Sequence, residues 1–322
     1  MIGKSGLKTG ENIKELRVEN KQGKWAYFKK NYGGYLYMLP VILGIIIFTI
    51  VPMVMSLVYS FCDYNFYMYE TKDMYTNFGF QNYINMFTAD WDGLSNSLFI
   101  TFRYAIVTVV VSMVGSYILA LFLNQKLKGI AAFRVIYYLP CLIPAVVSTL
   151  LWRNITDVDS GYINLIFDAL GLDKYTFYSQ KETVFPSILI LGVVGWGGNM
   201  IMWLAQIKNI PAELFEAADI DGASYLRKVF MITIPLSTAM IFYILIVSII
   251  GALQVFSAYY PLINGVNRSE LNFIVIKIYD TAFVEYDISY ASALSWFLFV
   301  IIGFLTAIIF KTSRWVYYGE AQ

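Results

Sequence analysis

Long apolar stretches alternate with short polar ones along the whole chain, and this alternation predicts its elements. Six stretches are apolar and about 20 residues long, the length that an α-helix needs to cross a hydrocarbon core of roughly 30 Å. In lipid, every backbone polar group must be bonded internally, so each stretch is expected to be helical. The pattern predicts an all-α polytopic membrane protein with about six transmembrane helices. These spans lie at about 35–61, 97–124, 131–153, 184–207, 231–257 and 290–310.

The polar segments between these runs predict the domain organisation. We expect an N-terminal arm at 1–34, a six-span domain at 35–310 with a polar insert at 208–230, and a tail at 311–322. The first apolar run is too long for the core of a cleavable signal peptide, so it is interpreted as a first span.

Three further features lie inside this six-span framework. Pro140 and Pro144 predict a bend in the third span. The stretch DSGYINLIFDALGL at 159–172 predicts a short amphipathic helix along the membrane surface. The stretch LNFIVIKIYDTAF at 271–283 is too short and too charged to span, and it predicts a surface or re-entrant helix.

Composition supports the membrane assignment and excludes several activities. The chain is 58% apolar and only 14% charged, against roughly 25% charged residues in soluble domains. It has no histidine, which argues against nucleophile–histidine catalysis and histidine-based zinc sites. Its two cysteines, Cys62 and Cys141, form no disulfide or metal pattern. No GxxxxGK[ST] motif occurs, so the chain has no Walker-type ATP site. We expect no catalytic residues, no metal and no cofactor in this chain.

The distribution of lysine and arginine predicts the orientation of the spans. One side of the membrane would carry 16 basic residues: eight in the arm, three in each of the links after spans 2 and 4, and two in the tail. The other side would carry six. Such an excess marks the cytoplasmic side. With six spans, both termini are therefore expected in the cytoplasm, together with the polar insert.

The polar insert continues into span 5 as EAADIDGASYLRKVFMITIP, at Glu216–Pro235. Asn209 is expected to cap a new helix, with Pro211 in its first turn. Acidic residues come early and basic residues late, which suits a helix macrodipole, and Gly222 interrupts the helical propensity. The pattern predicts two short helices joined near Gly222. Its composition alone also fits an ordinary amphipathic linker.

The spacing of the insert resembles the EAA loop of bacterial ABC importer permeases, EAA-x3-G-x9-I-x-L-P. Ile234 stands where that family usually has leucine, a near-isosteric change. The stretches FGFQNYINMF, FRVIYYLPCLIPAVVSTLLW and KNIPAELFEAA resemble the carbohydrate branch, which includes the maltose and glycerol-3-phosphate permeases. LINGVN resembles an outer loop of that branch, with Val266-Asn267 in place of Gly-Pro. The resemblance runs from about Tyr35 to Arg314.

The resemblance implies a type I ABC importer permease, in which the insert is a coupling helix that docks on a cytoplasmic ATPase. It implies a bacterial plasma-membrane complex with a second homologous permease, two ATPase chains that bind ATP and Mg, and an extracytoplasmic solute-binding protein. The lipid membrane and a carbohydrate are expected ligands, and nucleic acid is not. The coupling positions would be Glu216, Ala217, Ala218, Asp219, Gly222, Ala223, Ile232 and Pro235.

Polar and aromatic groups inside spans 4 and 5 predict where a sugar would bind. Sugars take hydrogen bonds and stack on aromatic faces, and polar groups at mid-membrane depth are costly unless they are used. The same side chains would also suit helix–helix hydrogen bonds or plain packing. The candidates are Trp196, Asn199, Trp203, Gln254, Ser257 and Tyr259.

Three other functions are alternatives to import of an oligosaccharide. An importer of glycerol-phosphate esters or a similar solute would favour a buried Lys or Arg in spans 4 or 5, and the sequence has none there. An ion-coupled secondary transporter would need intramembrane carboxylates, which the spans lack away from their ends. An intramembrane enzyme would need a histidine or a buried aspartate pair. The carbohydrate importer is therefore the favoured hypothesis.

Overall fold

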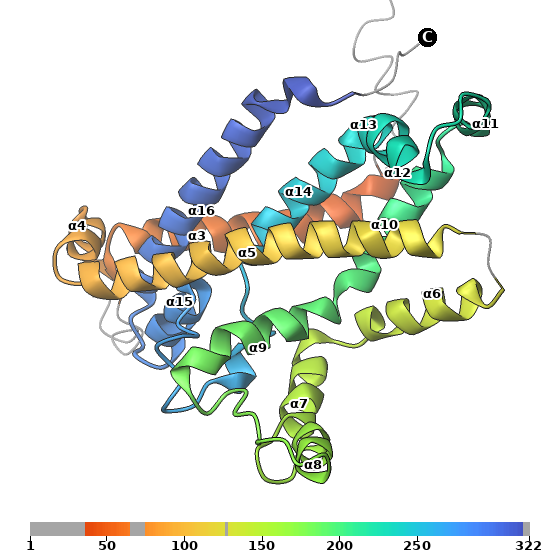
Figure 1. The fold of residues 1–322 in the computed structure, drawn as a ribbon. Helices are drawn as coiled ribbons and strands as arrows, with labels where there is room; N and C mark the ends of the chain where they lie inside the picture. Colours follow the sequence, from red (N-terminus) through yellow and green to blue (C-terminus); the bar gives the residue numbers. More distant parts are fainter. Residues whose placement is uncertain (1–35, 65–74, 126–127, 318–322) are drawn as a thin grey trace, which may run out of the picture. The chain divides into compact units, whose positions relative to one another are not determined.

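The computed structural model describes residues 36–64, 75–125 and 128–317 of this chain (Figure 1). The predicted arm at 1–34 and the last residues of the predicted tail lie outside the described residues. The chain divides into two compact units, residues 1–58 and 59–322. The first unit contributes nearly all of a helix that covers Leu36–Ser60 and includes a π-turn, η1 (Ile46–Ile50), followed by α3 (Val51–Ser60).

Among the described residues, three helices are long and apolar enough to cross a membrane, and three bent helix pairs bring the number to as many as six. This agrees with the predicted all-α, six-span fold. The three long helices are Leu36–Ser60, α5 (Trp91–Leu123) and α16 (Ile288–Lys311). The bent pairs are α6 (Ile130–Tyr138) through η3 (Leu139–Leu142) to α7 (Ala145–Ile155), α9 (Lys181–Val193) to α10 (Trp196–Lys208), and α12 (Tyr225–Lys228) through η4 (Val229–Thr233) and α13 (Ile234–Leu236) to α14 (Thr238–Leu253).

The bends have local causes in the backbone. The third span turns by 104° at its break, where Pro140 and Pro144 provide no N–H and disfavour a helical residue before them. The predicted bend there is confirmed. The fourth span bends by 43° just before Gly195, and the fifth bends by 69° at Ser237, two residues after Pro235.

Short elements connect the spans. The short helix predicted within 159–172 is present as α8 (Tyr162–Ala169). The short helix predicted within 271–283 is α15 (Ile274–Phe283), which packs against α5 and α16. Two short strands, which the sequence analysis did not predict, pair antiparallel with Asp63 opposite Thr76. The remaining elements are β1 (Asp63–Tyr64), β2 (Tyr75–Thr76), α4 (Gln81–Phe87), α11 (Ala212–Ile220), η5 (Tyr260–Leu262) and η6 (Ser313–Trp315).

Two span boundaries differ clearly from the sequence prediction. Helix α5 begins at Trp91 rather than near 97, and at 1.5 Å per residue its 33 residues extend about 50 Å, well beyond a bilayer core. Helix α14 ends at Leu253 rather than at 257, so its 16 residues extend only about 24 Å. The fifth span therefore continues as irregular backbone, which needs partners inside the protein or water.

The second unit has three clusters of buried apolar side chains, and α5 contributes to all of them. Close packing depends on small residues, as expected between membrane helices. A Cβ on Gly115 of α5 would lie 2.2 Å from the Trp196 ring, and one on Gly197 of α10 would lie 2.0 Å from the carbonyl oxygen of Tyr137. Helix α10 is therefore fixed between α5 and α6.

Candidate functional site

The polar insert forms two helices, α11 and α12, at one end of the second unit (Figure 1). Gly222 joins them with φ +73°, a left-handed conformation that favours glycine. The N–H of Ala223 donates to Ala218 O at 2.9 Å, and the N–H of Gly222 donates to Asp219 O at 3.1 Å, which is the Schellman pattern for ending a helix. The prediction of two helices joined near Gly222 is confirmed.

The predicted start of the insert is corrected. Asn209 does not cap α11. It ends α10, where its backbone N–H donates to Ala205 O at 3.2 Å. Pro211 stands at the N-cap position of α11 and not inside its first turn, because it has φ −55° and ψ 131°. Ser224 caps α12 instead, by accepting a hydrogen bond from the N–H of Arg227 at 3.4 Å.

Helix α11 exposes its side chains. It has no buried residue, and Leu214 and Ile220 are 43% and 88% exposed. Within the described residues, the carboxylate of Glu216 forms no hydrogen bond or ion pair. A short helix with exposed apolar residues and an unpaired carboxylate has the character of an interaction surface. Ala217 is exposed and Ala218 is half-buried, so a partner can approach the backbone there.

An ion pair joins the two helices of the insert. Lys228 Nζ lies 2.5 Å from Asp219 Oδ1, across the Gly222 turn. The pair is partly exposed, so its contribution to stability is small, about 0–1 kcal/mol. It spans the Gly222 turn and so links α11 to the helix that continues into span 5.

Ile232 and Pro235, the last two predicted coupling positions, do not lie on the exposed insert. Ile232 is half-buried in the π-turn η4, and Pro235 lies in α13 at the start of span 5. Pro235 has no N–H to donate to the preceding turn, which is consistent with the widened turn just before it. The motif therefore covers both the exposed helix and the bent segment that connects it to the membrane.

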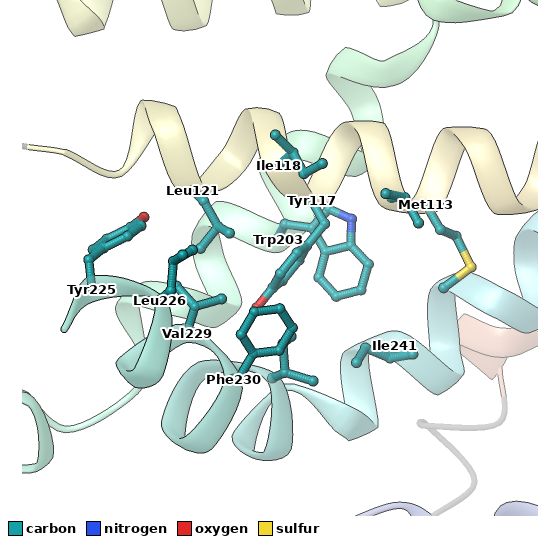
Figure 2. Close-up of a pocket in the computed structure, with 12 residues that line it drawn as sticks. Met113, Tyr117, Ile118, Leu121, Trp203, Tyr225, Leu226, Val229, Phe230 and Ile241 are labelled. Carbon is teal, nitrogen blue, oxygen red and sulfur yellow. The ribbon is translucent and has the colours of Figure 1, made fainter. Parts of the chain in front are cut away.

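An apolar cavity of about 490 Å³ lies between this bent segment, α5, α10 and α14 (Figure 2). Trp203 forms part of its wall. It is buried, its indole N–H donates to Ser116 Oγ at 3.1 Å, and its ring packs edge-on against Tyr117 at 5.0 Å. The structure thus places Trp203 beside the polar insert. The cavity is lined by Met113, Val114, Tyr117, Ile118, Leu121, Trp203, Tyr225, Leu226, Val229, Phe230, Ile234 and Ile241.

A second region follows α14 and is named here the Gln254–Tyr260 turn, after its first and last residues. Tyr259, the next-to-last residue of this turn, is buried. The Tyr259 hydroxyl lies 2.9 Å from Tyr104 OH and donates to Ile188 O at 3.4 Å. The turn is therefore fixed by a side chain that points into the core. Gln254 and Ser257, by contrast, are exposed.

The turn meets the breaks of two other spans. Thr149 of α7 donates from Oγ1 to Ala258 O at 2.7 Å, and Cys141 Sγ lies 3.6 Å from Gly195 O, joining the broken third span to the broken fourth. These segments line a cavity of about 350 Å³, and no described residue in its wall carries a charged side chain. Interrupted helices at membrane depth are characteristic of transporter binding sites. Its lining residues are Pro140, Cys141, Ile143, Ala145, Ser148, Thr149, Leu191, Gly192, Val194, Gly195, Ala258 and Tyr259.

Three predicted substrate residues keep their polar groups free. The side chains of Asn199, Gln254 and Ser257 form no hydrogen bond with another residue that the structure describes. Trp196 is half-buried against Gly115, one residue after the break at Gly195. The sequence did not identify Cys141, Ser148 and Thr149 as cavity residues, although the two nearby prolines were a signal for the break.

Comparison with known proteins identifies the family. The chain is 35% identical over 302 residues to the probable ABC transporter permease protein YesP of Bacillus subtilis (strain 168), covering 91% of this chain and 94% of that protein. It is 27% identical over 314 residues to the arabinooligosaccharides transport system permease protein AraP of the same organism, covering 95% and 97%. No protein-family model matches the chain. The chain belongs to the family of ABC transporter permeases, and it is a multi-pass membrane protein.

Solved structures show the same fold. One is the crystal structure of a bacterial alginate ABC transporter in complex with an alginate pentasaccharide-bound periplasmic protein, with a TM-score of 0.80, 22% identity and coverage of 90% of this chain and 97% of that chain. A second, of a bacterial ABC transporter involved in the import of the acidic polysaccharide alginate, has a TM-score of 0.81, 23% identity and coverage of 90% and 98%. The predicted type I importer permease architecture is confirmed.

Proposed function

We propose that this permease is a subunit of an ATP-driven importer for a carbohydrate, an oligosaccharide in particular. The observation that carries this proposal is the uncharged cavity at the meeting point of three interrupted spans. Hydroxyls, a thiol, backbone carbonyls and an aromatic ring suit a neutral sugar better than a phosphate ester, which would favour a buried cation. Relatives named for arabinooligosaccharides, trehalose/maltose and lactose support the same substrate class.

Asn199, Gln254, Ser257 and Trp196 do not line this cavity themselves; they lie near its lining residues in the sequence of spans 4 and 5. Within this proposal, Asn199, Gln254 and Ser257 hydrogen-bond a sugar that extends beyond the cavity, and Trp196 offers an apolar face to its ring. Their free polar groups support this role, because buried or membrane-depth polar groups gain most from new partners. Trp203 and Tyr259 have a structural role in this proposal and do not hydrogen-bond the sugar, since their polar atoms already have partners in the protein.

The proposed coupling surface is α11, with Glu216 and the small residues Ala217 and Ala218 in contact with a cytoplasmic ATPase. The exposed side chains of this helix support the role, together with the carboxylate of Glu216, which has no partner among the described residues. The excess of basic residues on the side of the insert supports cytoplasmic termini. The complete machine would contain a second homologous permease, two ATPase chains that bind ATP and Mg, and an extracytoplasmic binding protein in a bacterial plasma membrane.

The proposal is tested by purifying the tagged chain from its native membrane in mild detergent and identifying co-purifying proteins by mass spectrometry. We expect an ATPase and a second permease with the unaltered chain. Glu216→Lys is expected to lose the ATPase and keep the permease, because a reversed charge opposes docking at α11. Glu285→Lys, an exposed carboxylate outside the insert, is the matched control and should keep both. Retention of the ATPase by Glu216→Lys would contradict the coupling role.

Uptake measurements test the substrate class. The co-purified assembly is reconstituted in vesicles with its binding protein and tested for ATP-dependent uptake of labelled oligosaccharides and of glycerol phosphate. Uptake of an oligosaccharide is the expected result. Uptake of the phosphate ester alone would replace the carbohydrate assignment.

A further inference from the structure

A buried carboxylate lies on α15, outside the cavity and the insert. Asp280 is only 6% exposed. Arg268 Nη2 donates to its Oδ2 at 2.7 Å, and Tyr260 OH donates to its Oδ1 at 3.4 Å. A buried charge is costly unless it is paired and hydrogen-bonded. The carboxylate therefore holds both partners in fixed positions.

Through Tyr260, this carboxylate reaches the Gln254–Tyr260 turn. The carbonyl oxygen of Phe256 accepts hydrogen bonds from the N–H groups of Tyr259 and Tyr260, both at 3.0 Å. The rings of Phe256 and Tyr260 stack at 5.0 Å, and Tyr279 of α15 contacts both rings. Ser257 lies inside this small closed loop. Its position therefore depends on where Tyr260 is held.

Helix α15 is itself a rigid support. Lys277, three residues before Asp280 on the same helix, lies with its Nζ 2.9 Å from Asp90 Oδ2. Tyr290 of α16 donates to the same carboxylate at 2.6 Å. The ends of α5, α15 and α16 are thereby joined, and Asp280 is attached to elements that are fixed by other contacts.

We propose that Asp280 is a positioning residue for the substrate. It holds Tyr260, and with it the Gln254–Tyr260 turn, in the conformation that presents Gln254 and Ser257 to the hydroxyl groups of a neutral sugar. Arg268 neutralises the carboxylate and fixes its orientation. This inference rests on the proposed carbohydrate-import function. Asp280 is expected to affect how well the permease binds the sugar, and not the rate at which the partner ATPase hydrolyses ATP.

The test uses the reconstituted complex with its binding protein and measures sugar molecules imported per ATP hydrolysed. Asp280→Leu removes the acceptor that both Tyr260 and Arg268 use, and it is expected to lower this ratio about tenfold, the equivalent of one charge-assisted hydrogen bond. The ATPase rate stimulated by the sugar-loaded binding protein should stay within about twofold. A purely structural defect would lower uptake and ATPase activity together, so the ratio separates the two explanations.

Two companion variants make the test decisive. Arg268→Met removes the charged partner of Asp280 and should also lower the number of sugar molecules imported per ATP. Arg268→Lys keeps a positive charge there and should retain most of the unaltered ratio. Glu285→Gln removes a carboxylate that lies just beyond α15 and has no partner among the described residues, so it should change nothing. If Asp280→Leu does not assemble, the result for Arg268→Met decides the test. Sugar import with an unchanged ratio in these variants would overturn the inference, whereas no sugar import by the unaltered complex would overturn the proposed function.

Discussion

At the scale of a single residue, Gly222 shows how a local conformation can be specified by one missing atom. A Cβ added there would find open space, because nothing lies within 4 Å of it. The penalty for another residue is thus confined to the backbone, where the left-handed conformation costs roughly 1–2 kcal/mol for most L-residues. Asparagine tolerates this region better than alanine does.

We therefore predict that Gly222→Ala destabilises the Schellman turn by about 1 kcal/mol and reduces uptake, with Gly222→Asn less affected. The measurement is uptake in vesicles together with thermal unfolding of the purified complex. Gly303→Ala is the control, because this glycine lies within α16 and has equally open space around it. Alanine is the better helix former, so stability should be equal or slightly higher. Equal uptake by Gly222→Ala and Gly303→Ala would contradict the role given to the turn.

At the scale of an element, the proposed coupling role of the insert depends on the angle between α11 and α12. The ion pair between Lys228 and Asp219 spans the turn between these two helices, although its energy is small. The bent segment that begins with α12 borders an apolar cavity, and Trp203 of α10 forms part of the opposite wall (Figure 2). A displacement of α11 would therefore be transmitted to a segment with room to move.

Reversing the charges of this pair tests the element. Asp219→Lys and Lys228→Asp should each reduce uptake several-fold, because like charges then oppose each other across the turn, while thermal stability changes by about 1 kcal/mol or less. The double variant restores an attractive pair and should recover most uptake. A double variant no better than the two single ones would show that the charges act on something other than each other.

At the scale of the whole molecule, contacts between distant parts of the sequence hold the second unit together. Asp90, Lys277 and Tyr290 are far apart in the chain, yet their side chains meet where α5, α15 and α16 converge. Both charged side chains are largely buried, at 16% exposure for Lys277 and 28% for Asp90. Removing one charge leaves the other poorly solvated.

Lys277→Met is therefore predicted to destabilise the protein by about 2 kcal/mol, somewhat less than the ~3–5 kcal/mol for a fully buried pair. Asp90→Asn should cost less, because an asparagine oxygen still accepts the hydrogen bond from Tyr290. Thermal unfolding of both variants in the same detergent gives the comparison. If Lys277→Met lowered the thermal stability less than Asp90→Asn does, the prediction would be wrong.

The amino-acid sequence alone was sufficient for the number of spans and for the helix–glycine–helix form of the insert. Both depend on local properties, namely the length of apolar runs, the motif spacing and the left-handed preference of Gly222. The break at Pro140 and Pro144 was predictable for the same reason, since a missing N–H acts within one turn of its own helix.

Only the tertiary structure decided which polar residues are free. No sequence signal separates Trp203 and Tyr259 from Gln254. In the structure, the polar atoms of Trp203 and Tyr259 have partners in Ser116 and Tyr104, whereas the amide of Gln254 has none among the described residues. The early end of α14 has the same origin, because Tyr259 points into a core built by α5 and α9. Burial is a property of packing between segments more than 70 residues apart in the chain, and no local pattern encodes it.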